Sequence, residues 1–289
     1  MTPPRLGPVQ GATLVTADLA QCTASYCDHL HQREHHRGVL ADAEARALGW
    51  PELGGTPCAW LANTLDEPWL RIIENPDAER QQPFEHYGWL SLEISVRDVD
   101  ALGKALEDSP FDIIGPPANL AVGEAIRAMQ VVGPCGEVLY LTEIKADLPP
   151  FELPRARCPV DRLFIPVMMA PDREAALGHY EQCAGAEGLR FETRITVISG
   201  ARGLDRDHPH PVATLQLPGN TLIEIDQVDG LAPAAFANAS PPTGIALAHF
   251  RHGNPEGAAA PEQDPGAWSL NDFHLATGAA GERYLVQNP

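Results

Sequence analysis

The chain has 289 residues, which corresponds to about two domains at roughly 150 residues per domain. It is 44% hydrophobic and 20% charged, as ordinary globular proteins are, and this composition excludes a disordered chain. Its 20 Lys and Arg face 39 Asp and Glu, and the net charge of -19 repels phosphate backbones and anionic lipids, so we expect neither a nucleic-acid nor a membrane partner.

No apolar run reaches the ~18 residues that a membrane span needs, and the first residues lack the apolar core of a signal peptide. We therefore expect a cytoplasmic protein. The six cysteines form no CxxC pair and no zinc-finger spacing, so we expect them to be reduced.

One pattern recurs along the chain: an apolar alternating strand, then an Asp suited to cap a helix, then an amphipathic helix. Three copies have their Asp, and the large apolar residue eight positions later, at Asp18 and Tyr26, Asp98 and Leu106, and Asp172 and Tyr180. Further strand-like runs follow each helix, so each copy predicts a βαβββ unit. The apolar run 244–250 predicts a fourth, degenerate copy.

A single small sheet with one helix cannot bury both of its faces, so the units are expected to pair. The predicted fold class is α+β, with four βαβββ units paired into two half-barrel cups. Residues 1–146 are expected to form the N-terminal pair with the ligand cup, and residues 159–289 the C-terminal pair. The proline-rich segment 147–158 is the predicted linker between them.

With its closing hairpin Gly-Pro-Cys-Gly-Glu-Val-Leu-Tyr-Leu at residues 133–141, the unit resembles those of the vicinal oxygen chelate superfamily. Glyoxalase I, bleomycin-resistance proteins and extradiol dioxygenases are members. The resemblance implies a small-molecule ligand in the cup. In many members it also implies a divalent metal held by His, Gln or Glu on the first and last strands of the paired units.

Counting from the Asp and from the closing turns gives the positions in this chain that match those ligands. They are Gly11, Glu74, Ser91 and Tyr140 for the N-terminal cup, and Ile165, Glu224, Gly244 and Leu285 for the C-terminal cup. Neither set offers more than one strong ligand, whereas a two-His-one-carboxylate site needs three. We therefore predict no metal ligands and no cofactor. A metal-dependent dioxygenase with a misregistered site stays open as an alternative.

The N-terminal cup supplies the predicted catalytic residues. Glu93 is expected to face an apolar cavity that raises its pKa, so that it serves as a general base. Tyr140 and Arg127 are expected to stabilise the oxyanion that develops on the substrate. The competing interpretations are an exposed or paired Glu93, a Tyr140 that belongs to the core and an Arg127 at the surface.

Five further residues complete the predicted ligand site, either by stacking on a planar ligand or by contacting it: Trp89, Ser91, Glu74, His86 and Met129. The competing interpretation is that Trp89 belongs to the core.

The predicted function is binding of a small, apolar or aromatic oxygenated molecule, with isomerase or lyase chemistry that uses no tightly bound metal. A non-catalytic protein that sequesters its ligand, as bleomycin-resistance proteins do, is the second alternative. The architecture also permits a homodimer.

Overall fold

The computed structural model describes residues 5–120, 123–238, 240–253 and 272–288, and four βαβββ-like units follow one another along them. The first unit contains β1 (Leu6–Thr16), α1 (Leu19–His29), β2 (Arg33–Val39), β3 (Pro57–Ala62) and β4 (Pro68–Glu74), with α2 (Asp42–Ala47) and the 3-10 helix η1 (Pro51–Leu53) between β2 and β3. The second contains β5 (Gly88–Val96), α3 (Val99–Leu106), β6 (Asp112–Asn119), β7 (Ile126–Val132) and β8 (Val138–Ile144).

The third unit contains β9 (Val160–Ala170), α4 (Arg173–Ala184), β10 (Leu189–Arg194), β11 (Pro209–Leu217) and β12 (Thr221–Gln227), with α5 (Thr196–Ala201) between β10 and β11. The 3-10 helix η2 (Ala235–Ala237) leads to the fourth unit, which contains β13 (Gly244–His252), β14 (Phe273–Thr277) and β15 (Arg283–Gln287). The segment between β13 and β14, residues 254–271, lies outside the described residues.

Each predicted Asp caps its helix. Asp18 accepts a hydrogen bond from the amide of Gln21 (2.9 Å), Asp98 from that of Ala101 (2.9 Å) and Asp172 from that of Ala175 (3.0 Å). These bonds satisfy backbone donors that have no partner within the helix. The repeat seen in the sequence is therefore a repeat of helix starts.

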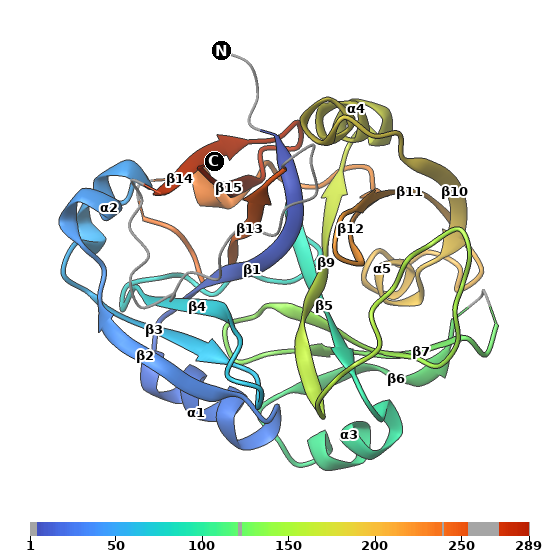
Figure 1. The fold of residues 1–289 in the computed structure, drawn as a ribbon, viewed down its shortest axis with the longest axis horizontal. Coiled ribbons are helices and arrows are strands. Elements are labelled where there is room, and N and C mark those ends of the chain that lie inside the picture. Colours follow the sequence, from blue (N-terminus) through green and yellow to red (C-terminus); the bar gives the residue numbers. More distant parts are fainter. Residues whose placement is uncertain (1–4, 121–122, 239, 254–271, 289) are drawn as a thin grey trace.

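The strands form two curled sheets, which lie on the left and on the right in Figure 1. The first has the order β14-β15-β13-β1-β4-β3-β2, and the second has the order β10-β11-β12-β9-β5-β8-β7-β6. The first strands of the units pair antiparallel, β1 with β13 and β5 with β9. The predicted half-barrel fold is confirmed.

The predicted partners within each sheet are wrong, because unit 1 pairs with unit 4 and unit 2 with unit 3. Hydrophobic periodicity defines a strand and its faces, but it does not say which edge strands meet. The segment 147–158 therefore connects two units of the same sheet, with β8 before it and β9 after it.

Units 1 and 2, and likewise units 3 and 4, contact each other through a buried tyrosine–glutamate hydrogen bond. The Tyr26 hydroxyl of α1 donates to Glu137 in unit 2 (2.7 Å), and the Tyr180 hydroxyl of α4 donates to Glu282 in unit 4 (2.7 Å). The main apolar core surrounds both bonds. The same contact thus joins units 1 and 2 and units 3 and 4.

The hollow of the first sheet is filled by its own chain. Leu40, Leu48, Trp50 and Leu53 of the segment around α2 and η1 pack on the apolar residues of this sheet. Arg71 pairs with Glu44 of α2, and Arg283 donates to the carbonyl of Leu48 (2.6 Å). Over the described residues, this segment and the side chains it contacts occupy the hollow of the first sheet.

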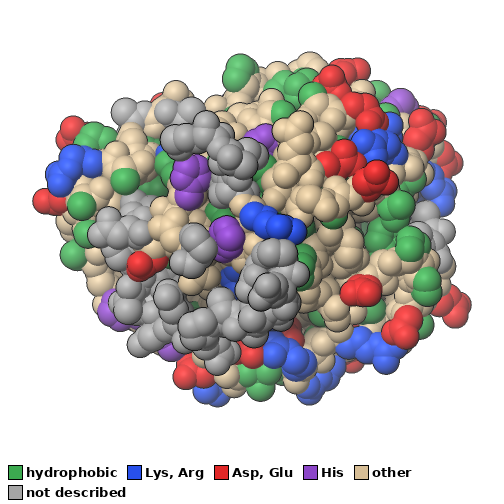
Figure 2. All heavy atoms as spheres, turned by 45° about the horizontal axis from the view of Figure 1, so that its top comes forward, with side chains coloured by type: hydrophobic (Ala, Val, Ile, Leu, Met, Phe, Trp, Pro, Cys, Tyr) green, Lys and Arg blue, Asp and Glu red, His purple; other side chains and the backbone are tan. Residues whose placement is uncertain are grey.

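Over the described residues, no helix has the length and apolar composition of a membrane span. Figure 2 shows Asp and Glu side chains interspersed with Lys and Arg on one face of the molecule.

Replacing Tyr26 by Phe is expected to lower the free energy of unfolding by about 1 to 3 kcal/mol, because the buried Glu137 carboxyl loses a donor. Tyr180→Phe should have a similar effect through Glu282. Chemical denaturation measures both changes. Arg37→Ala, which removes an exposed ion pair with Glu34, is the control and should stay within about 0.5 kcal/mol of the wild type. A Tyr26→Phe variant as stable as that control would contradict the assigned role.

Candidate functional site

A cavity of ≈ 200 Å³ lies on the concave face of the second sheet, between units 2 and 3. Most of its wall is apolar and includes Ile126, Leu148, Phe151, Phe164, Ile165 and Leu222. An engineered apolar cavity of about 150 Å³ holds one benzene ring. The cavity thus has room for a ring with a short substituent.

Two glutamates from different units face this cavity. Glu93 comes from β5 and Glu224 from β12, and β9 lies between these two strands. Two strand spacings separate β5 from β12 by about 9.5 Å, and the two glutamates are also offset by two positions along β9, because Glu93 lies opposite Ile165 and Glu224 opposite Val167. Glu93 alternates along β5 with Leu92 and Ile94, which belong to the main core, so the pleat of the strand directs the carboxyl into the cavity.

Burial changes the acidity of both carboxyls. Removal from water is the largest of the causes that bring the pKa of Glu93 to about 8. The negative charge of Glu224 contributes to this rise, and the Thr142 hydroxyl, which donates to Glu93 Oε1 (2.7 Å), opposes it. Removal from water raises the pKa of Glu224 to about 7. The two groups interact, so they titrate as a pair near neutral pH.

Two hydroxyl groups next to these carboxyls have no hydrogen-bond partner among the described residues. The Tyr140 hydroxyl comes from the residue opposite Glu93 in the β5–β8 ladder, and the Thr214 hydroxyl from the residue opposite Glu224 in the β11–β12 ladder. Burial and the nearby carboxylates raise the pKa of Tyr140 well above its usual value. Its hydroxyl therefore keeps its proton and is available to a ligand as a donor.

A third carboxyl lies deeper on the same strand as Glu224. Asp226 is 0% exposed, and neither of its carboxylate oxygens has a hydrogen-bond partner among the described residues. Burial raises its pKa well above the usual value, and the charges of Glu224 and Glu93 add to the effect. This part of the sheet thus carries three buried carboxyl groups, and each of them holds either a negative charge or a proton.

The predicted face of β5 is only partly correct. Ser91 shares the face of Glu93 and is buried, but Trp89 packs against the main core, and its indole N–H donates to the carbonyl of Arg283 (2.7 Å). A register shift between Trp89 and Ser91 in the β5–β9 ladder reverses the alternation at that point. Trp89 and His86 line a separate hollow of ≈ 20 Å³.

Three other predicted residues lie away from the cavity. Arg127 pairs with Asp100 at the start of α3 (2.7 Å), and Met129 is in the main core, because both occupy the face of β7 opposite to that of Ile126, Ala128 and Gln130. The prediction that Arg127 reaches the cup is therefore wrong. Glu74 lies in the other sheet and accepts a hydrogen bond from the amide of Leu19 (3.0 Å), so it helps to begin α1.

The structure adds residues that sequence reasoning placed elsewhere or missed. Glu224 was assigned to a different cup from Glu93, and the sheet order brings them together. Leu148, Phe151 and Leu153 of the predicted linker form part of the cavity wall. In the sequence, the apolar residues between the prolines of that segment are the feature that indicates a packed segment and not a linker in solvent.

The donor set does not fit the metal centre that the resemblance implies. Tyr140, Ile165 and Glu224 line the cavity at the expected positions, and Ser91 completes the set on β5. Only Glu224 is a strong ligand there, and among the described residues no group of three His, Cys, Asp or Glu ligand atoms within 4.8 Å of one another includes it.

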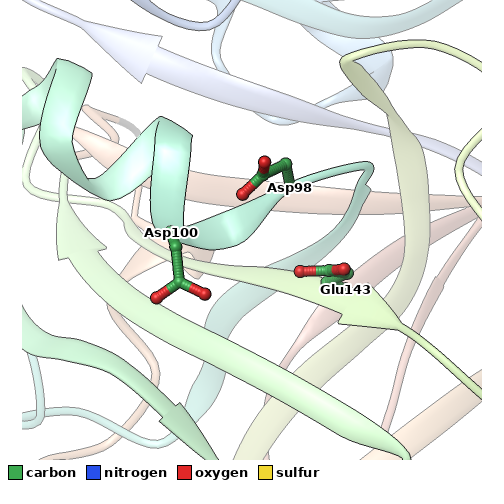
Figure 3. A group of neighbouring side chains, drawn as sticks. All are labelled: Asp98, Asp100 and Glu143. Carbon is green, nitrogen blue, oxygen red and sulfur yellow. The ribbon is translucent and has the colours of Figure 1, made fainter.

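Among the described residues, one group of carboxylates lies close enough to share a cation: Asp98, Asp100 and Glu143. Figure 3 shows them at the start of α3 and on β8 beside it. Each has a structural task, because Asp98 caps α3, Asp100 pairs with Arg127 and Glu143 accepts from the amide of Val99 (3.2 Å). We assign this group to the helix start.

No protein-family model and no curated protein matches the chain. Solved structures do. Glyoxalase I from Zea mays is 13% identical with a TM-score of 0.60, over 97% of this chain and 92% of that one. A dioxygenase-like protein from Bacillus subtilis is 11% identical with a TM-score of 0.61, over 98% of this chain and 86% of that one. The chain thus has the fold of the vicinal oxygen chelate superfamily, and at these identities the likeness concerns the fold alone.

Glu93→Gln is expected to reduce the pH dependence of stability. The folded protein holds the Glu93 proton up to a pKa of about 8, whereas the unfolded chain releases it near 4.5, so the free energy of unfolding falls as pH rises between these values. Each proton that the folded protein keeps and the unfolded chain releases lowers the free energy of unfolding by about 1.4 kcal/mol per pH unit. Denaturation between about pH 5 and pH 9 should give a flatter profile for the variant, and a higher stability than the wild type above pH 8.

Asp100→Asn is the control for this measurement. Asp100 is exposed and its Arg127 partner holds the pKa below its usual value, so its titration lies outside this pH range. Parallel stability curves for Glu93→Gln and the wild type would show that Glu93 ionises as it does in water.

Proposed function

We propose that the cavity binds a small, apolar or aromatic molecule with an oxygen function, and that Glu93 and Glu224 move protons in it, as in an isomerase or a lyase. The observation that carries the proposal is the presence of two carboxyls in one apolar cavity, both with a pKa near neutrality. Such a pair supplies a base and an acid at the same pH. Proton transfer by a positioned carboxyl typically contributes 10²- to 10⁴-fold to a rate.

The mechanism begins with the carboxylate of the pair. It removes a proton from a carbon next to a carbonyl group, and the C–H electrons move to form an enol or enolate. Tyr140 donates a hydrogen bond to the carbonyl oxygen, on which negative charge develops. Thr142 holds Glu93 in place through its hydroxyl.

The protonated carboxyl completes the reaction. It returns a proton to a different carbon of the substrate in an isomerisation, or to the departing group in a lyase reaction. The distance between β5 and β12 leaves space for a substrate between the two groups. Arg127, which is bound to Asp100, takes no part in this scheme.

The two alternative functions require different features of the same cavity. A protein that only sequesters its ligand needs the apolar wall and no titrating pair. A metal-dependent dioxygenase needs three strong ligands that converge, and the donors at the expected positions argue against it.

The proposed chemistry is tested by hydrogen–deuterium exchange in an enolisable aryl ketone such as 1-phenylpropan-2-one, followed by NMR in D2O. The wild type should accelerate the exchange at the carbon next to the carbonyl. Glu93→Gln and Glu224→Gln should each lower the enzymatic rate by about 10²- to 10⁴-fold, because each removes one member of the acid–base pair.

Arg127→Lys provides the control, since Arg127 lies outside the cavity, and it should exchange the ketone as fast as the wild type. If the wild type binds the ketone without accelerating exchange, the sequestering alternative is favoured.

A further inference from the structure

The charges around the cavity are unbalanced. Glu93 and Glu224 line it, and Asp226 lies behind Glu224 on β12. Arg194 is the one cationic residue among those that line the cavity in the described part of the chain. It is exposed and pairs with Asp207 (2.9 Å), so its charge is already satisfied outside the site.

Buried carboxylates without a counter-ion are costly, so such groups are usually protonated or paired with a cation. The polar atoms that face the cavity are suited to a cation. The unpartnered hydroxyls of Tyr140 and Thr214 offer oxygen lone pairs beside the two glutamates. An ammonium group needs acceptors, and it finds carboxylates and hydroxyls here, while the guanidinium of Arg194 is paired with Asp207.

The rest of the wall is suited to an apolar body. Phe151 and Phe164 lie with aliphatic side chains around the cavity. Aromatic faces also attract cations through their quadrupoles. The volume of ≈ 200 Å³ limits the ligand to about one ring with a short chain.

We infer that the cavity takes a small apolar amine in its protonated form, with the ammonium group between Glu93 and Glu224 and the apolar body against Phe151 and Phe164. This inference rests on the proposed function, because it places the ligand in the same cavity, and it names the class of substrate. An anionic ligand is excluded by the same charges.

Three single-ring probes that differ in charge test the inference on the full chain at neutral pH: benzylamine, benzyl alcohol and benzoate. Isothermal titration calorimetry should give at least tenfold tighter binding of benzylamine than of benzyl alcohol, and no binding of benzoate. This comparison on the wild type does not depend on the folding of any variant.

Two variants locate the charge recognition. Glu93→Gln and Glu224→Gln should each weaken benzylamine binding at least tenfold and leave benzyl alcohol binding within about twofold, because an amide is close in shape to a carboxylate but carries no charge. Asp100→Asn also removes one negative charge, at an exposed position outside the cavity, and it should leave both affinities unchanged. Circular dichroism checks that each variant is folded.

The outcomes separate this inference from the proposed function. If benzyl alcohol binds as tightly as benzylamine, or if both glutamine variants bind benzylamine normally, the amine class is overturned while ketone exchange is unaffected. If benzylamine binds through the glutamates and no variant changes ketone exchange, the amine class stands and the acid–base mechanism fails. If none of the three probes binds, the inference is overturned as well.

Discussion

The antiparallel pairing of β5 with β9 is the contact on which the site depends. It joins units 2 and 3 into one sheet and places Glu93 on the same concave surface as Glu224. In the cavity, removal from water raises the pKa of Glu224 to about 7 and is the main reason that the pKa of Glu93 rises to about 8. The charge of Glu224 contributes to the shift of Glu93, so the two carboxyls titrate as a pair near neutral pH.

Over the described residues, the two sheets have similar strand orders, with seven strands in the first and eight in the second, and their concave faces hold different side chains. In the first sheet Arg71 is buried on β4, its guanidinium pairs with Glu44 and its Cζ atom lies 5.6 Å from the centre of the Trp60 ring. The helix α2 that supplies Glu44 is an insertion between β2 and β3, and with Trp50 it fills the hollow. The matching insertion in unit 3 carries α5, which contributes only its start to the wall of the cavity. A difference between two loops thus decides which sheet keeps a cavity.

The sequence predicted the units and their faces well, because periodicity and capping act over a few residues. The helix starts at Asp18, Asp98 and Asp172 are confirmed, as is the half-barrel fold. Strand alternation correctly placed Glu93 toward a cavity. It failed for Trp89, where a register shift reverses the faces, and a shift of this kind depends on the partner strand rather than on the strand's own residues.

The larger error concerned the partners of the units, and it has a different physical origin. Neighbouring units do make specific contacts, through Tyr26 with Glu137 and Tyr180 with Glu282, but these join a helix to a turn. The strand edges pair unit 1 with unit 4, and unit 2 with unit 3, which segment 147–158 connects. Since Leu148 and Phe151 of that segment line the cavity, the connection that appeared to separate two domains instead closes the site between them. A ligand in the cavity therefore contacts both halves of the chain and the segment that joins them.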